Sequence, residues 1–96
     1  MASLRCIKKD INYLVNEVVS DCYTALYFKD QSKREDIIAI MEEAVDFRNQ
    51  MIDRANHPAE KHNKSLVKKH YAFLRNELME RIDGLFDKLS KVVNEK

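Results

Sequence analysis

The amino-acid sequence predicts an all-α protein, an elongated antiparallel bundle of three helices in up-down-up order that forms one domain over residues 1–96. Three observations favour this fold class. Apolar residues recur every three or four positions through most of the chain, as in amphipathic helices. A single Gly and a single Pro in 96 residues argue against a sheet protein built on tight turns. Two short polar breaks divide the pattern, and short connections join antiparallel helices.

The first helix is expected over residues 3–29, with Ser3 as its N-cap. It contains both cysteines, and a rise of about 1.5 Å per residue separates Cys6 from Cys22 by about 24 Å. That separation is too long for a disulfide between them. We expect two reduced thiols in a cytoplasmic protein, with an intermolecular disulfide through Cys6 as the alternative. The apolar face comprises Leu4, Ile7, Ile11, Leu14, Val15, Val18, Cys22, Ala25 and Leu26.

The second helix is expected over residues 33–56. Ser32 and Glu35 have the spacing of a capping box at its start. His57 precedes Pro58, and the residue before a proline is disfavoured in a helix, so the helix ends there. Its apolar face comprises Ile37, Met41, Ala44, Val45, Met51, Ile52 and Ala55.

Arg48 falls in the middle of this apolar face, where a charge must be paired or reach water. Three explanations are open. The side chain extends along its own stem to solvent, or it lies at a subunit interface, where arginine is favoured. In the third, it pairs with an acidic residue of a neighbouring helix: Asp10, Glu17 or Asp21.

The third helix is expected over about residues 60–94, with a start between Pro58 and Lys64 and with Glu60 close behind the proline. Its apolar spacing continues across Gly84, which costs roughly 1 kcal/mol relative to alanine inside a helix. We therefore predict one uninterrupted helix. Its apolar face comprises Val67, Tyr71, Leu74, Leu78, Ile82, Leu85, Leu89 and Val92.

Several apolar side chains lie beside these faces and form a candidate interaction surface. In a hairpin centred near residues 58–59, positions whose numbers add up to about 120 lie opposite one another, which places Phe47 against Phe73. The two rings either widen the seam between the second and third helices or belong to a face that binds a second copy or another helical protein. Aromatic residues and arginine are enriched at such interfaces. The surface comprises Phe47, Arg48, Leu66, His70, Phe73, Tyr23 and Tyr27.

Residues 61–75 contain five basic side chains and no acidic one. One explanation is pairing across the hairpin, with Asp46 near Arg75 and Asp53 near Lys68. The other is a patch that binds the phosphates of a nucleic acid, although the formal net charge of the whole chain is only +1. The patch comprises Lys61, Lys64, Lys68, Lys69 and Arg75.

No sequence motif predicts catalysis, a cofactor or a small-molecule substrate. A single Gly excludes the G-x-S-x-G turn of serine hydrolases. His57 and His62 are five residues apart, which on a helix points them about 140° away from each other, whereas His62 and His70 could share one side. The H-E-x-x-H and Glu-x-x-His motifs are absent, so we expect no metal site, with a metal-binding bundle as a further alternative. No apolar segment approaches the roughly 20 residues that span a bilayer, and the start of the chain lacks the apolar region of a secretory signal.

The stretch DINYLVNEVV, residues 10–19, resembles small helical proteins of unknown function from Bacteroidetes-type bacteria. The resemblance implies a cytoplasmic bacterial helical bundle and transfers no site residues. We therefore expect a non-enzymatic protein that acts through protein–protein contact, most simply as a homodimer. Nucleic-acid binding through residues 61–75 is the alternative.

Overall fold

The computed structural model describes residues 4–28, 31–57 and 63–94. These residues form three α-helices and one short 3-10 helix, without any strand, so the predicted all-α three-helix fold is confirmed. The positions predicted to begin the first and third helices, Ser3, Pro58 and Glu60, lie outside the described residues. The elements are α1 (Leu4–Phe28), η1 (Gln31–Lys33), α2 (Arg34–Asn56) and α3 (Lys64–Asn94).

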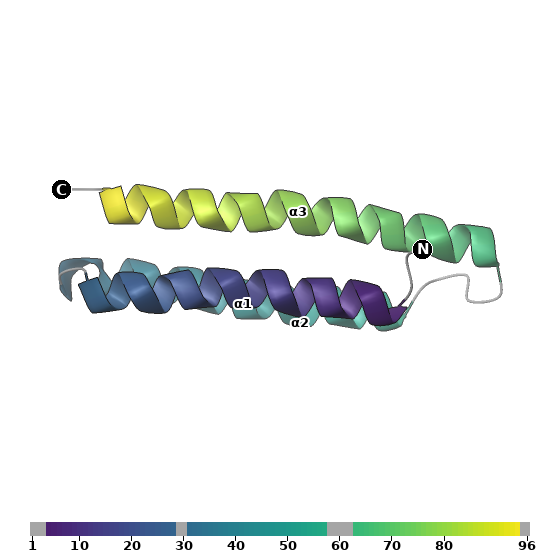
Figure 1. Cartoon of the computed structure of the whole chain (residues 1–96), viewed down its shortest axis with the longest axis horizontal. Helices are drawn as coiled ribbons and strands as arrows, with labels where there is room; N and C mark the ends of the chain where they lie inside the picture. The colour runs from purple at the N-terminus through teal and green to yellow at the C-terminus, as the bar shows by residue number, and fades with distance from the viewer. Residues whose placement is uncertain (1–3, 29–30, 58–62, 95–96) are drawn as a thin grey trace.

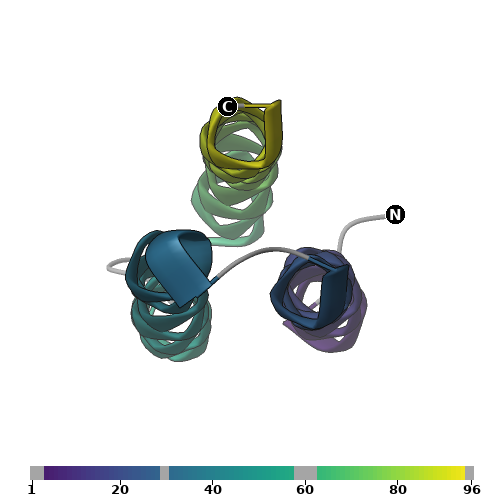
Figure 2. The same cartoon turned by 90° about the vertical axis from the view of Figure 1, so that its left-hand side faces the viewer.

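The three helices lie side by side as rods (Figure 1) and form a triangle when seen along the bundle (Figure 2). The extents of 52 × 18 × 16 Å make the protein strongly elongated. Ion pairs between Arg54 and Glu77 and between Glu43 and Lys88 show that α2 and α3 run in opposite directions. Helix α1 runs in the same direction as α3, because Asp10 contacts Arg75 and the last turns of both helices line a common groove.

The core consists of one apolar stripe from each helix. Spacings of three and four residues keep each stripe on one side of its helix, and no polar or charged residue is fully buried among the described residues. The predicted faces of the first and third helices supply most of this core. Its members are Ile7, Ile11, Val15, Val18, Cys22, Ala25, Ile37, Ile40, Ala44, Phe47, Met51, Ala55, Tyr71, Leu74, Leu78, Ile82, Leu85 and Leu89.

The start of α2 differs from the predicted capping box. The N-cap is Lys33, whose side chain forms no capping hydrogen bond. Ser32 lies one position earlier, inside the 3-10 turn η1, so its hydroxyl is not at the cap position that a capping box requires. The capping-box prediction is therefore wrong, although Glu35 and Asp36 still place negative charge in the first turn, where the helix dipole favours it.

The start of α3 lies at the late end of the predicted region, because the helix begins at Lys64. Asn63 is its cap: the side-chain oxygen Oδ1 accepts a hydrogen bond of 3.2 Å from the Leu66 amide. The Asn63 carbonyl accepts the first helical bond, 3.0 Å from the Val67 amide. Asparagine is among the best N-cap residues because its short side chain reaches these free amides.

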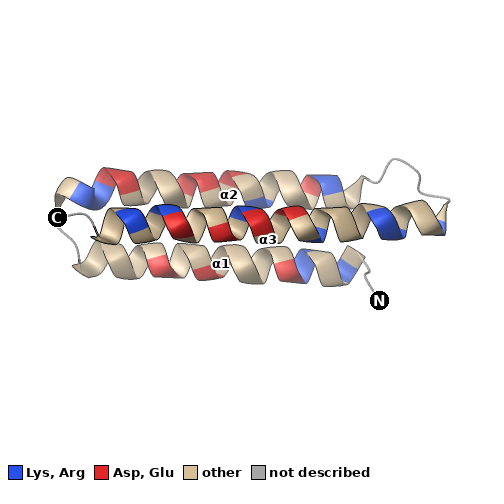
Figure 3. Ribbon diagram, turned by 90° about the horizontal axis from the view of Figure 1, so that it is seen from above, with Lys and Arg blue, Asp and Glu red and all other residues tan. Residues whose placement is uncertain are grey.

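The late start of α3 moves it along α2. The residue numbers of the pairs Arg54–Glu77 and Glu43–Lys88 both add up to 131 rather than about 120. The first turns of α3 consequently extend past the end of α2 (Figures 1 and 3). Phe47 lies in the core with the guanidinium of Arg81 4.9 Å from its ring centroid, whereas Phe73 is 61% exposed. The predicted contact between Phe47 and Phe73 is wrong.

Helix α3 is continuous through Gly84, as predicted. A Cβ atom added at this position would meet nothing within 4 Å, and the backbone φ angle is not positive. Neither close packing nor an unusual backbone conformation therefore requires glycine here.

Candidate interaction surface

An apolar groove lies between α1 and α2, and no residue of α3 lines it. Tyr23 and Leu26 come from α1, and the carboxylates of Glu42 and Asp46 lie among the lining residues of α2. The volume of this α1/α2 groove is about 600 Å³. Its other lining residues are Ile38, Met41 and Val45.

A second groove lies between the last turns of α1 and α3, with a volume of about 410 Å³. Phe28 of α1 and Phe86 of α3 are its aromatic members. It lies at the same end of the bundle as the α1/α2 groove, because both contain residues from the last two turns of α1. The remaining lining residues are Asp21, Thr24, Ala25, Leu89, Ser90, Val93 and Asn94.

Exposed aromatic side chains gather on the last turns of α1, beside both grooves. Tyr23 is 62% exposed, Tyr27 84% and Phe28 76%. The rings of Tyr27 and Phe28 meet edge to face, with centroids 5.2 Å apart. Sequence reasoning identified the two tyrosines and missed Phe28, although its place next to Tyr27 was a usable signal. Aromatic residues left in water in this way are typical of protein-binding surfaces.

The structure does not bring all predicted surface residues together. Leu66 and Phe73 are exposed, but they belong to the first turns of α3, at the opposite end of the bundle from the last turns of α1 (Figure 1). Phe47 is only 3% exposed, so its place in an interaction surface is a wrong prediction. Its side chain lies in the core, with the guanidinium of Arg81 over its ring.

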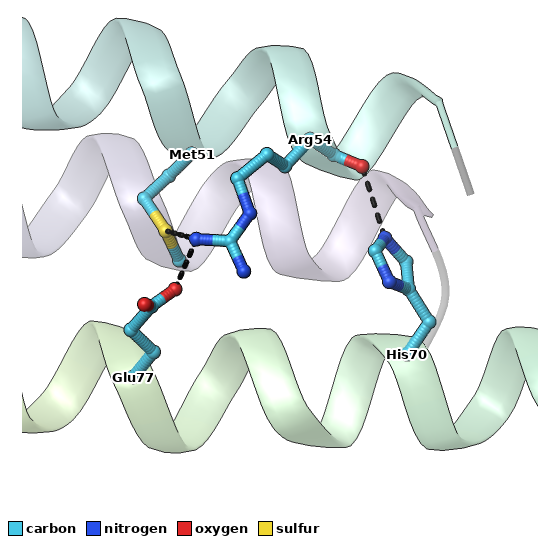
Figure 4. A network of polar contacts seen from close by, with 4 residues as sticks. All are labelled: Met51, Arg54, His70 and Glu77. Atoms are coloured by element: carbon cyan, nitrogen blue, oxygen red, sulfur yellow. Dashed lines mark hydrogen bonds and ion pairs between the residues drawn. The ribbon is translucent and has the colours of Figure 1, made fainter. Parts of the chain in front are cut away.

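His70 and Arg54 belong to a polar network that joins α2 to α3 (Figure 4). The Nε2 atom of His70 donates a hydrogen bond of 2.9 Å to the carbonyl oxygen of Arg54. The same carbonyl accepts a bond of 3.3 Å from the His57 amide. The guanidinium of Arg54 pairs with the carboxylate of Glu77 and lies 3.8 Å from the Met51 sulfur. His70 thus adds a second hydrogen bond to a carbonyl in the last turn of α2, beside the one from the His57 amide.

Arg48 is half-buried on α2. Its Nη2 atom donates a hydrogen bond of 3.3 Å to Oδ1 of Asn49. No described ion pair joins it to Asp10, Glu17 or Asp21, and Asp10 pairs with Arg75 instead. An acidic partner within the same chain is therefore not found among the described contacts, and the stem of Arg48 carries its charge to the edge of the apolar face.

The predicted basic patch is smaller than expected. Nη2 of Arg75 lies 2.7 Å from Oδ2 of Asp10, so this charge is neutralised in the seam between α1 and α3. The predicted pairing of Arg75 with Asp46 is wrong, because Arg75 pairs with Asp10 of α1. Asp53 contacts His57, four residues further along the chain, at 3.4 Å, rather than Lys68. Lys64, Lys68 and Lys69 are exposed, and Lys61 lies outside the described residues.

The described residues hold no group of three histidine, cysteine, aspartate or glutamate side chains arranged to bind a metal ion; His62 lies outside them. Within the same residues, no helix has the length and apolar character needed to cross a membrane. Cys22 is buried, and Cys6 is exposed. Burial, and next the charge of Asp21, raise the pKa of the Cys22 thiol from 9.0 to about 11, so this thiol is not poised to act as a nucleophile near neutral pH.

Comparison of the chain with models of protein families, with curated proteins and with solved structures gives no match. The function of the chain therefore has to be inferred from its own surface. The most distinctive part of that surface is the α1/α2 groove with the exposed aromatic residues beside it.

Proposed function

We propose that the chain is a non-enzymatic protein-interaction module that binds an α-helix of another chain in the α1/α2 groove. The observation that carries this proposal is the composition of the groove. Apolar side chains from two adjacent helices form its floor, and the largely exposed ring of Tyr23 stands at its edge. An amphipathic helix recognises such a groove with apolar residues spaced three and four apart.

The exposure of the groove residues supports this role. Ile38 and Val45 are 37% and 36% exposed although they belong to an amphipathic helix whose core residues are almost fully covered. Met41 and Leu26 beside them are half-buried. A continuous apolar patch of this kind on a small protein marks an interaction site more often than an incidental surface, and methionine adapts its shape to a partner.

Site-specific photo-crosslinking tests the proposal. A benzophenone amino acid replaces Val45 in the groove and, as the matched control, Met79, an exposed apolar residue of α3. Irradiation in cells of the source organism is expected to give one discrete adduct from position 45 and none from position 79. Adding Ile38→Glu is expected to abolish the adduct, because a partner helix would bury the new carboxylate without a counter-charge.

The far-ultraviolet circular dichroism spectrum of each variant establishes that the bundle still folds. A folded variant that gives no adduct from position 45, or equal adducts from both positions, contradicts the proposed function. Persistence of the adduct in the Ile38→Glu variant does so too, since the partner would then contact some other surface.

A second candidate function is binding of the phosphate backbone of a nucleic acid. It is supported by the first turns of α3, which extend past the end of α2 (Figures 1 and 3) and carry Lys64, Lys68 and Lys69 into solvent. This function predicts a gel shift of duplex DNA or RNA at low salt that weakens as salt rises and is lost in Lys68→Glu/Lys69→Glu. Equal mobility with the wild-type chain and the double variant eliminates it.

A further inference from the structure

We infer that the α-helix bound at the α1/α2 groove is α2 of a second copy of this chain, packed antiparallel on the same face, with Glu42 of each copy against Arg48 of the other. This inference rests on the proposed function and names the partner of the same site. It is carried by the continuation of the apolar face beyond the groove and by the distribution of charge along that face.

The face that contains the groove continues toward the other end of the bundle. Met41 and Val45 line the groove. Arg48 and Ile52 follow them by seven residues, about two helical turns, and so lie on the same side of α2. Ile52 packs at the edge of the core and is half-buried, as Arg48 is. On α1, Val19 precedes Leu26 by the same seven residues and is also half-buried.

Charge is divided between the two ends of the α1–α2 pair. Figure 3 shows basic residues in the first turns of α1 and acidic residues further along it. On α2 the order is reversed, with mostly acidic residues in the first half and two arginines in the second. Because the two helices run in opposite directions, like charges gather at the same end of the pair. Asp10, Glu43 and Arg54 pair with α3 and do not belong to this face. Of the other charges, the acidic end has Glu17, Asp21, Glu35, Asp36, Glu42 and Asp46, with Arg34; the basic end has Arg5, Lys8, Lys9 and Arg48, with Asp53.

This division of charge selects the antiparallel orientation. A second copy laid on the face in the same direction would bring acidic end against acidic end. A copy laid in the reverse direction brings the acidic end of each chain against the basic end of the other, and such complementarity favours one orientation over another. The orientation is that of a two-fold symmetric dimer, in which one self-complementary face serves both chains.

The spacing along α2 places the two-fold axis. If the two-fold axis passes beside Val45, a residue that precedes Val45 by some number of positions lies opposite the residue of the second copy that follows Val45 by the same number. Glu42 then opposes Arg48, and Ile38 opposes Ile52, so that charge meets opposite charge and apolar meets apolar. The symmetry makes each pair twice. It also gives Arg48, which lies within an apolar face and has only Asn49 among its described hydrogen-bond partners, a carboxylate partner.

A charge-swap experiment tests the inference. Sedimentation velocity is expected to show a dimer of the purified wild-type chain at micromolar concentration. Glu42→Arg and Arg48→Glu are each expected to raise the dissociation constant of the dimer by at least about tenfold, because like charges then face each other twice across the axis. The double variant Glu42→Arg/Arg48→Glu is expected to return the dissociation constant to within about threefold of the wild-type value.

The design separates contacts between chains from effects within one chain. Positions 42 and 48 are six apart, which is not one of the spacings that bring two side chains of one helix into contact, so restoration in the double variant requires contact across the interface. Glu80→Arg, on an exposed position of α3, is the matched charge change and is expected to leave the dimer unchanged. Val45→Cys with Cys6→Ala is expected to form a disulfide-linked dimer on mild oxidation, since residues beside the axis bring their Cα atoms within about 7 Å.

Two results overturn the inference. One is a wild-type chain that stays monomeric at all concentrations, and the other is a wild-type dimer that the double variant fails to restore. Neither result contradicts the proposed function, because only the photo-crosslinking experiment tests whether the groove binds a partner. An adduct from position 45 with a different protein, together with a monomeric purified chain, keeps the proposed function and rejects the second copy.

Discussion

Replacing Phe47 by alanine is expected to lower the free energy of unfolding by about 3–5 kcal/mol, the range for a fully buried phenylalanine. Phe73→Ala, which removes the same atoms from α3, is expected to change it by less than about 0.5 kcal/mol, as exposed substitutions do. The reason is burial, because Phe47 is 3% exposed in the core and Phe73 is 61% exposed. Urea denaturation followed by far-ultraviolet circular dichroism measures both changes.

The loss of stability in Phe47→Ala is a large part of the roughly 5–15 kcal/mol that stabilises a typical small domain. The urea concentration at the midpoint of unfolding is therefore expected to fall far below that of the wild-type chain. The paired substitution controls for the intrinsic helix preference of alanine, which is the same in both variants. Equal losses at the two positions would show that Phe47 and Phe73 share one seam, as a hairpin centred near residues 58–59 requires, and would contradict the register of α2 and α3 described here.

The apolar face of each helix could be predicted from the sequence because it depends on that helix alone. A face that packs against any neighbour repeats every 3.6 residues. This periodicity correctly identified Leu74, Leu78 and Ile82 as core residues, together with Ile7 and Ile11 of α1. It required no knowledge of which helices surround them or of how far along each other they lie.

The pairing of residues between helices could not be predicted, because it depends on where α3 begins. Pro58 and Asn63 are both reasonable starting signals, and the helix begins after the second. Opposite positions in an antiparallel hairpin have residue numbers with a constant sum. Moving the centre of the hairpin by a few residues therefore shifts the residue opposite every position by twice that number of residues. The wrong contacts predicted for Phe47, Asp46 and Asp53 therefore have one common cause.

The candidate site was predictable only in part for a related reason. Tyr23 and Tyr27 lie beside the apolar stripe of α1, and their exposure follows from that position alone. Whether Ile38 and Val45 are covered depends on how closely α1 packs on the outer side of α2, which periodicity does not describe. The groove therefore emerged only from the three-dimensional arrangement.

Raising the pH above 9 is expected to destabilise the wild-type chain through Cys22. Burial of this side chain, and next the negative charge of Asp21, raise the pKa of its thiol from 9.0 to about 11. An unfolded chain releases the thiol proton near pH 9, whereas the folded chain retains it until about pH 11. Stability is therefore unaffected below about pH 9 and is lost progressively as the pH rises from 9 toward 11.

The loss is on the order of 3 kcal/mol for a difference of about two pKa units, and a comparison with Cys22→Val isolates it. Valine is close to cysteine in size and does not ionise, while the tyrosines and lysines titrate equally in both chains and cancel in the difference. The unfolding free energies of the two chains, from urea denaturation at several pH values, are expected to diverge only above about pH 9. Cys6→Ala, at an exposed position, is expected to retain the full alkaline loss. Parallel curves for the wild-type chain and Cys22→Val would show that the thiol ionises as readily in the folded bundle as in water, which is incompatible with a sulfur sealed in the core.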